Sequence, residues 1–189
     1  MITPGRSGIT WIGVCLLILM TLPGARAQKI IGVETRYSNS FKEWNLVTDD
    51  PDLIGQLWMR WPFQNDWTSW DLQVGDTHAS IQQERPDDPN FWVIRCQGVI
   101  VNAKTAWSGE YYRWKLNDGN HQINWEARYA NQRDTWATDR LKEFNFQMHS
   151  DWKGDPRQWT IEDQLPEDVS LAMRVAMVFI TLHFSTPHR

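Results

Sequence analysis

The chain has 189 residues, with 19 basic and 23 acidic side chains, a net charge of −4 and 13 tryptophans. Its basic residues are scattered along the sequence, which argues against nucleic acid or an anionic lipid surface as the partner. Of the two cysteines, Cys15 lies in an N-terminal apolar run and Cys96 stands alone. An intramolecular disulfide is therefore not expected once that run is removed.

Residues 1–27 are typical of a secretory signal peptide. A polar start with Arg6 precedes the apolar run WIGVCLLILMTL, and the segment ends with small residues at Ala25 and Ala27. We expect cleavage between Ala27 and Gln28, which makes residues 28–189 a single secreted or periplasmic domain. An uncleaved N-terminal membrane anchor is the alternative, although the run is shorter than the ~20 residues that cross a bilayer.

A tryptophan recurs along the mature chain at intervals of 26, 22, 22, 22 and 23 residues, at Trp44, Trp70, Trp92, Trp114, Trp136 and Trp159. Periods of this length mark stacked supersecondary units. Each of these tryptophans is followed two positions later by leucine, isoleucine or threonine, and the residues between are mostly polar. Side chains two positions apart share one face of a strand, so each repeat predicts a strand with its tryptophan on the buried face.

Turn sequences divide the repeats into pairs of strands. GD at 75–76 and NDGN at 117–120 tolerate positive φ and favour hairpins. With KIIGVETRY as the first strand, the pattern predicts about twelve antiparallel strands, or six hairpins, between about residues 29 and 162.

The last segment has a different character. VSLAMRVAMVFITLHF, residues 169–184, is apolar around its circumference apart from Arg174. Pro166 suits a first helical turn and Pro187 a stop, so a helix is predicted over about 166–185. A helix that is apolar on all sides lies in a core or in a membrane. The charge at Arg174 favours burial inside the protein and leaves the mature chain without a transmembrane span.

These two parts fit one architecture. Twelve strands closed into a barrel would have a backbone diameter of roughly 24 Å, which is too wide for side chains alone to fill. An axial helix about 10–12 Å across, with a layer of tryptophans around it, would fill the space. The fold class predicted is therefore mainly β, with one buried C-terminal helix.

This arrangement resembles the tubby-like superfamily, which includes the tubby C-terminal domain, the LURP-one-related proteins and the phospholipid scramblases. The best local match is EDVSLAMRVAMVFITLHF, an acidic start followed by an apolar helix at the end of the chain. The resemblance implies a twelve-stranded barrel and non-enzymatic roles such as phosphoinositide binding or lipid movement. This acidic chain offers no basic headgroup pocket to match, so only the fold is carried over.

Three residues are candidates for ligand binding. Arg174 would anchor an anionic ligand at the barrel mouth, or else pair with a wall carboxylate. Trp58 and Trp67 lie outside the phase of the repeat, so they would stack on sugar rings or cover strand edges. The six repeat tryptophans are interpreted as packing. Cys96 shares the buried face of Trp92.

The sequence favours a secreted, non-catalytic binding or structural module, monomeric and without a metal or other cofactor. A carrier of lipid or another hydrophobic ligand is one alternative, and a protein that binds an envelope glycan through exposed aromatic rings is another. An enzyme is the least favoured class, because the histidines lack metal-ligand spacing and the chain has no nucleophile elbow or Walker loop.

Overall fold

The computed structural model describes residues 29–139 and 145–188. The predicted signal peptide and its cleavage site at Ala27 and Gln28 lie outside these residues.

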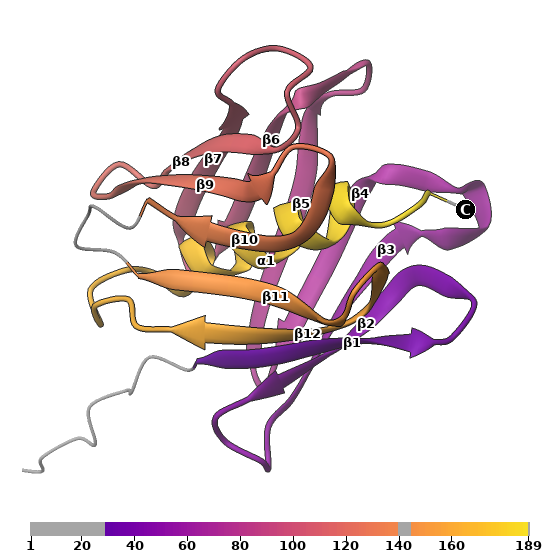
Figure 1. The fold of residues 1–189 in the computed structure, drawn as a ribbon. Helices are drawn as coiled ribbons and strands as arrows, with labels where there is room; N and C mark the ends of the chain where they lie inside the picture. Colours follow the sequence, from indigo (N-terminus) through magenta and orange to yellow (C-terminus); the bar gives the residue numbers. More distant parts are fainter. Residues whose placement is uncertain (1–28, 140–144, 189) are drawn as a thin grey trace, which may run out of the picture.

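The described chain forms a closed barrel of twelve antiparallel strands followed by one helix, which confirms the predicted fold class (Figure 1). The strands are β1 (Ile30–Tyr37), β2 (Ser40–Thr48), β3 (Ile54–Trp61), β4 (Asp66–Val74), β5 (Thr77–Arg85), β6 (Asp88–Cys96), β7 (Val99–Thr105), β8 (Arg113–Asn117), β9 (Gln122–Tyr129), β10 (Gln132–Thr138), β11 (Phe146–Trp152) and β12 (Asp155–Asp163). A short 3₁₀ turn, η1 (Pro62–Gln64), joins β3 to β4.

Each strand pairs with its neighbours in sequence, and the sheet closes where β1 pairs with β12. At this seam Val33 lies opposite Trp159. The wall is therefore a simple up-and-down meander whose first and last strands meet, and it has no free edge.

All six repeat tryptophans are buried and point into the barrel. The residues two positions after them are buried as well, namely Leu46, Leu72, Ile94, Leu116, Thr138 and Ile161. The period-two pattern in the sequence is thus the inward face of six hairpins, as predicted.

Each repeat tryptophan also makes the same polar contact. Its indole Nε1–H donates to the backbone carbonyl three residues earlier, over 2.8–3.3 Å. This bond satisfies the indole donor, which would otherwise be stranded inside the barrel. We call the six accepting residues the collar: Phe41, Trp67, Pro89, Tyr111, Arg133 and Pro156.

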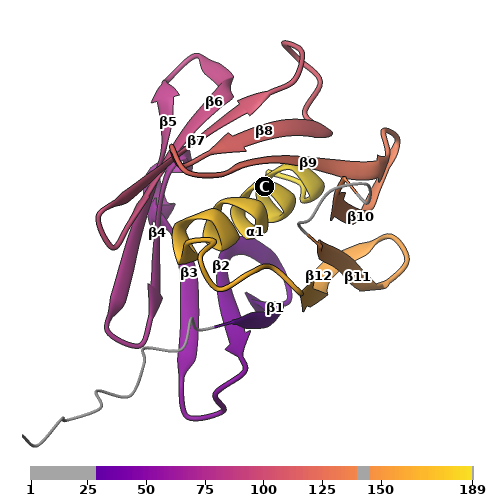
Figure 2. The ribbon, with the colours of Figure 1, turned by 90° about the vertical axis from the view of Figure 1, so that its left-hand side faces the viewer.

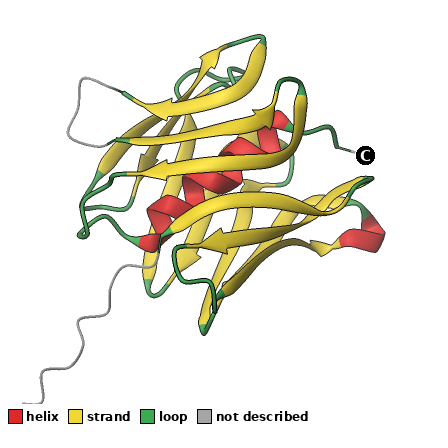
Figure 3. Ribbon diagram, turned by 60° about the horizontal axis from the view of Figure 1, so that its bottom comes forward, coloured by secondary structure: helices red, strands yellow, loops and turns green. Residues whose placement is uncertain are grey.

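The helix α1 (Leu171–Ser185) runs along the inside of the barrel, and strands surround it in Figures 2 and 3. Twelve consecutive residues, 172–183, are buried. The prediction of a first turn at Pro166 is wrong. Ser170 is the N-cap, and its side chain accepts the N–H of Met173, so the helix begins at Leu171. Residues 166–169 form a turn closed by a hydrogen bond from Val169 N–H to the Pro166 carbonyl.

A buried polar contact fixes the helix against the wall. The indole Nε1–H of Trp125, on β9, donates to the Thr181 hydroxyl at 3.1 Å. Because both residues are fully buried, this bond sets the rotation of the helix as well as satisfying the donor.

Candidate ligand-binding site

The two ends of the barrel differ in chemistry. We call the end where α1 begins the entry end and the end where it finishes the exit end. The exit end is formed by the turn before each repeat tryptophan, and it lies beside the C label in Figure 1. The collar residues lie at this end, because each comes just after one of these turns.

Arg174, a predicted ligand anchor, lies near the entry end and is not available to a ligand. Its Nε donates to Asp163 Oδ2 at 2.7 Å, and both side chains are only 1% exposed. The guanidinium also donates to the backbone carbonyls of Leu165, Pro166 and Val169. Arg174 therefore ties the helix to the end of β12 and to the loop between them. This is the second of the two roles expected from the sequence, pairing with a wall carboxylate.

The two candidate tryptophans fall in different places. Trp58 lies on β3 between the buried Leu57 and Met59, so its half-buried ring is on the outer face. Trp67 is a collar residue at the exit end, and its Nε1–H donates to Asn65 Oδ1 at 3.1 Å. The structure thus separates the three predicted candidates and leaves Trp67 alone at the barrel mouth.

The exit end carries an exposed aromatic rim that sequence reasoning did not identify. The rim consists of Tyr37, Trp61, Phe63, Trp107, Tyr129 and Trp152. These rings come from five of the six turns at this end, and Phe63 in η1 is fully exposed. Large apolar side chains gathered on one surface mark a site of interaction.

Three arginines stack on tyrosines at or near the same end. Arg36 lies over Tyr37, Arg128 over Tyr129 and Arg113 over Tyr112, with 5.4–5.8 Å between the guanidinium carbon and the ring centre. These cation–π contacts hold the guanidinium groups beside the rings on the surface.

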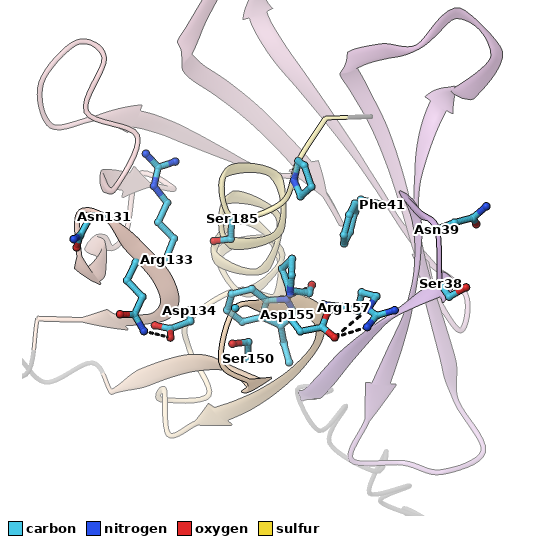
Figure 4. A pocket seen from close by; sticks show the side chains of 15 residues that line it. Ser38, Asn39, Phe41, Asn131, Arg133, Asp134, Ser150, Asp155, Arg157 and Ser185 are labelled. Carbon is cyan, nitrogen blue, oxygen red and sulfur yellow. Dashed lines mark hydrogen bonds and ion pairs between the residues drawn. The ribbon is translucent and has the colours of Figure 1, made fainter.

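Two pockets open inside the rim, on either side of the residues that follow α1. The larger has a volume of about 660 Å³, and Phe41, Trp159, Arg157 and Ser185 help to line it (Figure 4). The second, of about 450 Å³, is lined by Trp67, Tyr111, His183 and His188 among others. Arg133 lines both pockets, and together the two pockets include all six collar residues.

The end of the described chain folds over the second pocket. The His188 ring stacks on Trp67, with centroids 4.2 Å apart and planes inclined by 9°. Its Nε2 lies 2.9 Å from the His183 carbonyl. Thr186 and His188 therefore form part of the wall of the second pocket.

His183 is buried among aromatic rings in the last turn of α1. Its ring lies within 6.2 Å of Trp67, Trp70 and Trp92, measured between centroids. Burial, with a smaller contribution from the charge on His188, lowers the pKa of His183 well below its ordinary 6.5. The imidazole is therefore neutral at pH 7, and its buried Nδ1 makes no hydrogen bond to the described residues.

A histidine and two carboxylates also meet at the entry end, where their chemistry serves to start the helix. His121 Nε2 lies 3.2 Å from Asp168 Oδ2, and its Nδ1 lies 3.6 Å from Asp118 Oδ2. The Ser170 hydroxyl donates to Asp118 while it caps α1. Because this hydroxyl bonds to the carboxylate rather than to the imidazole, the cluster lacks the geometry of an activated nucleophile.

Other chemistry is limited in the part of the chain that the structure describes. No group of three or more histidine, cysteine, aspartate or glutamate side chains in it is placed to hold a metal ion. Cys96 is buried, as predicted, and burial raises the pKa of its thiol. Of the described helices, none has the length and apolar character needed to cross a membrane.

The chain matches no protein-family model, no curated protein and no solved structure.

A five-residue motif in the sequence was the missed signal for the collar. The segments SFKEW, DWTSW, DPNFW, EYYRW, QRDTW and DPRQW each end at a repeat tryptophan. The first residue of four of them accepts the backbone N–H two positions later, which forms the turn. The second residue is the collar residue. Aligning the repeats on the tryptophan would have shown this position to be aromatic or proline in five cases and arginine in one.

Proposed function

We propose that the protein is a secreted, non-catalytic module that binds saccharide through the exit end of its barrel. The concentration of exposed aromatic rings on that end is the observation that carries the proposal. Indole and phenol rings offer flat apolar faces to the C–H faces of sugars, and the pockets inside the rim supply hydrogen-bonding groups. Extracellular location follows from the predicted signal peptide.

The opposite end supports this choice of surface. Its turns carry the exposed carboxylates Asp49, Asp50, Asp52, Asp76, Glu167 and Asp168. Such a surface stays hydrated and repels other anions, so it suits solvent rather than a ligand.

The carrier alternative has less support. A lipid carrier needs room for an acyl chain beside the helix, whereas residues 172–183 of α1 are buried against the barrel wall. The larger pocket has many polar side chains in its lining, including Ser38, Asn39 and Asn131. A kinship with the tubby-like superfamily also stays a proposal. A closed twelve-stranded barrel around a C-terminal helix supports it.

The proposal is tested with a rim variant, Trp61→Ser/Phe63→Ser/Trp107→Ser/Trp152→Ser, made in the mature protein. Its matched control, Ile54→Ser/Val47→Ser/Ile100→Ser, removes exposed apolar side chains away from the rim. Affinity electrophoresis measures retardation of the mature protein in gels that contain neutral polysaccharides (soluble cellulose, glycol chitin, starch) or acidic ones (polygalacturonate, alginate).

We expect at least one polymer to retard the wild type and the control equally, and the rim variant at least about 10-fold less. Equal loss in the control would overturn the assignment to the exit end. Retardation by none of the polymers, or binding to phosphatidylglycerol vesicles alone, would overturn saccharide as the ligand.

A further inference from the structure

Arg133 departs from the pattern of the collar. The other five collar residues are aromatic or proline, and their side chains give the mouth of the barrel an apolar lining. Arg133 occupies the same position in the fifth hairpin, and its carbonyl accepts the Trp136 indole as in the other repeats. Its backbone therefore does what the repeat requires, while its side chain brings a positive charge to the mouth.

That charge is not neutralised by a carboxylate. Arg60, Arg157 and Arg174 each pair with an aspartate. For Arg133, by contrast, no carboxylate oxygen of the described residues lies within 4.0 Å of the guanidinium. Its one side-chain hydrogen bond runs from Nη1 to the Phe184 carbonyl, at 2.8 Å.

The Arg133 side chain is half-buried, and burial lowers the pKa of its guanidinium below the ordinary value for arginine, although the group stays charged at pH 7. Burying a cation without a counterion costs free energy, and a bound anion would offset that cost. In Figure 4 the side chain extends away from Asp134, whereas Arg157 is joined to the neighbouring Asp155. The remaining guanidinium donors of Arg133 are therefore available to a ligand.

A second unpaired group lies in the second pocket, which Arg133 also lines. The neutral His183 is 6% exposed and its Nδ1 has no hydrogen-bond partner among the described residues. A buried polar atom without a partner is rare in a folded protein, and a ligand hydroxyl would satisfy it. Trp67 and Tyr111, both half-buried, provide ring surface in that pocket.

We propose that Arg133, together with His183 and the collar rings Trp67 and Tyr111, forms a subsite for a sugar residue that carries a carboxylate. A guanidinium can donate two parallel hydrogen bonds to a carboxylate, so it selects the orientation of the ligand as well as its charge. This proposal rests on the proposed function and adds that the saccharide is acidic.

Asp87 allows a second, independent test of the proposal. It is exposed and lines the second pocket together with Arg133. A ligand carboxylate held by Arg133 would be repelled by it, so Asp87→Asn strengthens binding of an acidic sugar and leaves a neutral one unchanged.

The test compares oligogalacturonate with its methyl ester, which keeps the sugar and removes the charge. Isothermal titration measures the affinity of the full mature protein for each. Arg133→Gln removes the proposed contact, and Arg95→Gln is the matched control, because it removes an exposed arginine of β6 that lines neither pocket. Near-ultraviolet circular dichroism of the tryptophans checks that each variant is folded.

We expect the wild type and Arg95→Gln to bind the acid about 10- to 100-fold more tightly than the ester, the range of a hydrogen bond to a charged group. Arg133→Gln should bind both forms alike, and Asp87→Asn should bind the acid more tightly than the wild type does. Equal affinity of the wild type for acid and ester, or equal loss in the two arginine variants, would overturn the proposal. The proposed function would survive that outcome if the rim variant still lost saccharide binding.

Discussion

Arg174 and Asp163 form a buried ion pair, 2.7 Å from Nε to Oδ2, that joins the axial helix to the last strand of the wall. Removing one residue of the pair leaves the charge of the other buried and without a partner. We expect Arg174→Met to lower the free energy of unfolding by about 3–5 kcal/mol in urea titration. The double variant Arg174→Met/Asp163→Asn, which removes both charges, should recover at least about 1 kcal/mol of this loss. A double variant less stable than the single one would show that the pair is not coupled.

The repeat tryptophans are expected to stabilise the barrel by packing. Trp114 is buried in the wall, whereas Trp107, a few residues earlier, is 68% exposed. Trp114→Ala should lower the free energy of unfolding by ~3–5 kcal/mol, and Trp107→Ala by less than about 0.5 kcal/mol. Denaturant titration of both variants makes the comparison, and similar values for the two would contradict the packing role.

The contact between Trp125 and Thr181 isolates a single buried hydrogen bond. Thr181→Val keeps the shape of the side chain and removes the acceptor for the indole N–H. Stranding that donor in the core should lower the free energy of unfolding by about 1–3 kcal/mol. Thr181→Ser, which keeps the hydroxyl, is the control and should recover part of the loss. An unchanged unfolding midpoint for Thr181→Val would mean that the indole finds another acceptor.

His183 predicts a pH dependence of stability. The pKa of His183 is lowered in the folded protein. Below about pH 6.5, the pKa of histidine in the unfolded chain, the unfolded chain therefore binds a proton at this residue whereas the folded chain does not. The stabilisation is therefore complete above that value and falls as the pH drops, by at most about 1.4 kcal/mol per pH unit.

Urea titrations of the wild type and of His183→Phe at pH 7.5, 6.5 and 5.5 measure this effect. The difference between the two proteins should change in favour of the variant as the pH falls, because carboxylates contribute equally to both. A difference that is constant over this range would contradict a neutral, buried His183.

The barrel should not fold stably without α1, which fills its interior. Truncation of the chain before Pro166 removes α1 and leaves the inward tryptophans facing a void. We expect an aggregated or molten product, with dye binding and weak near-ultraviolet circular dichroism. A soluble truncation that unfolds cooperatively would show that the barrel does not need its core helix.

Much of the fold could be read from the spacing of six tryptophans and the apolar last segment. Intervals of 22 to 26 residues between these tryptophans indicate six hairpins, and a barrel of twelve strands is too wide for side chains alone to fill. The start of the helix was missed because Pro166 and the acidic residues after it resemble a first turn, whereas the Ser170 cap depends on its contact with Asp118, on a distant turn.

The candidate site was less predictable, because it also depends on contacts between residues that are far apart in the sequence. Arg174 stands out in the sequence as a charge in an apolar helix, yet its partner Asp163 lies on another element. Arg133 looks unremarkable in the sequence, and only the tertiary structure shows that no carboxylate comes near it. The rim residues are spread from Tyr37 to Trp152, and only closure of the barrel brings them to one end.

The pairing of β1 with β12 has a consequence for the order of events during folding. A growing polypeptide can form hairpins early, but it cannot complete the cylinder until its twelfth strand exists, nor fill the interior until the segment after that has arrived. Acquisition of the native state is thus postponed until β12 and the helix after it have been made, so the early hairpins remain without their core until then.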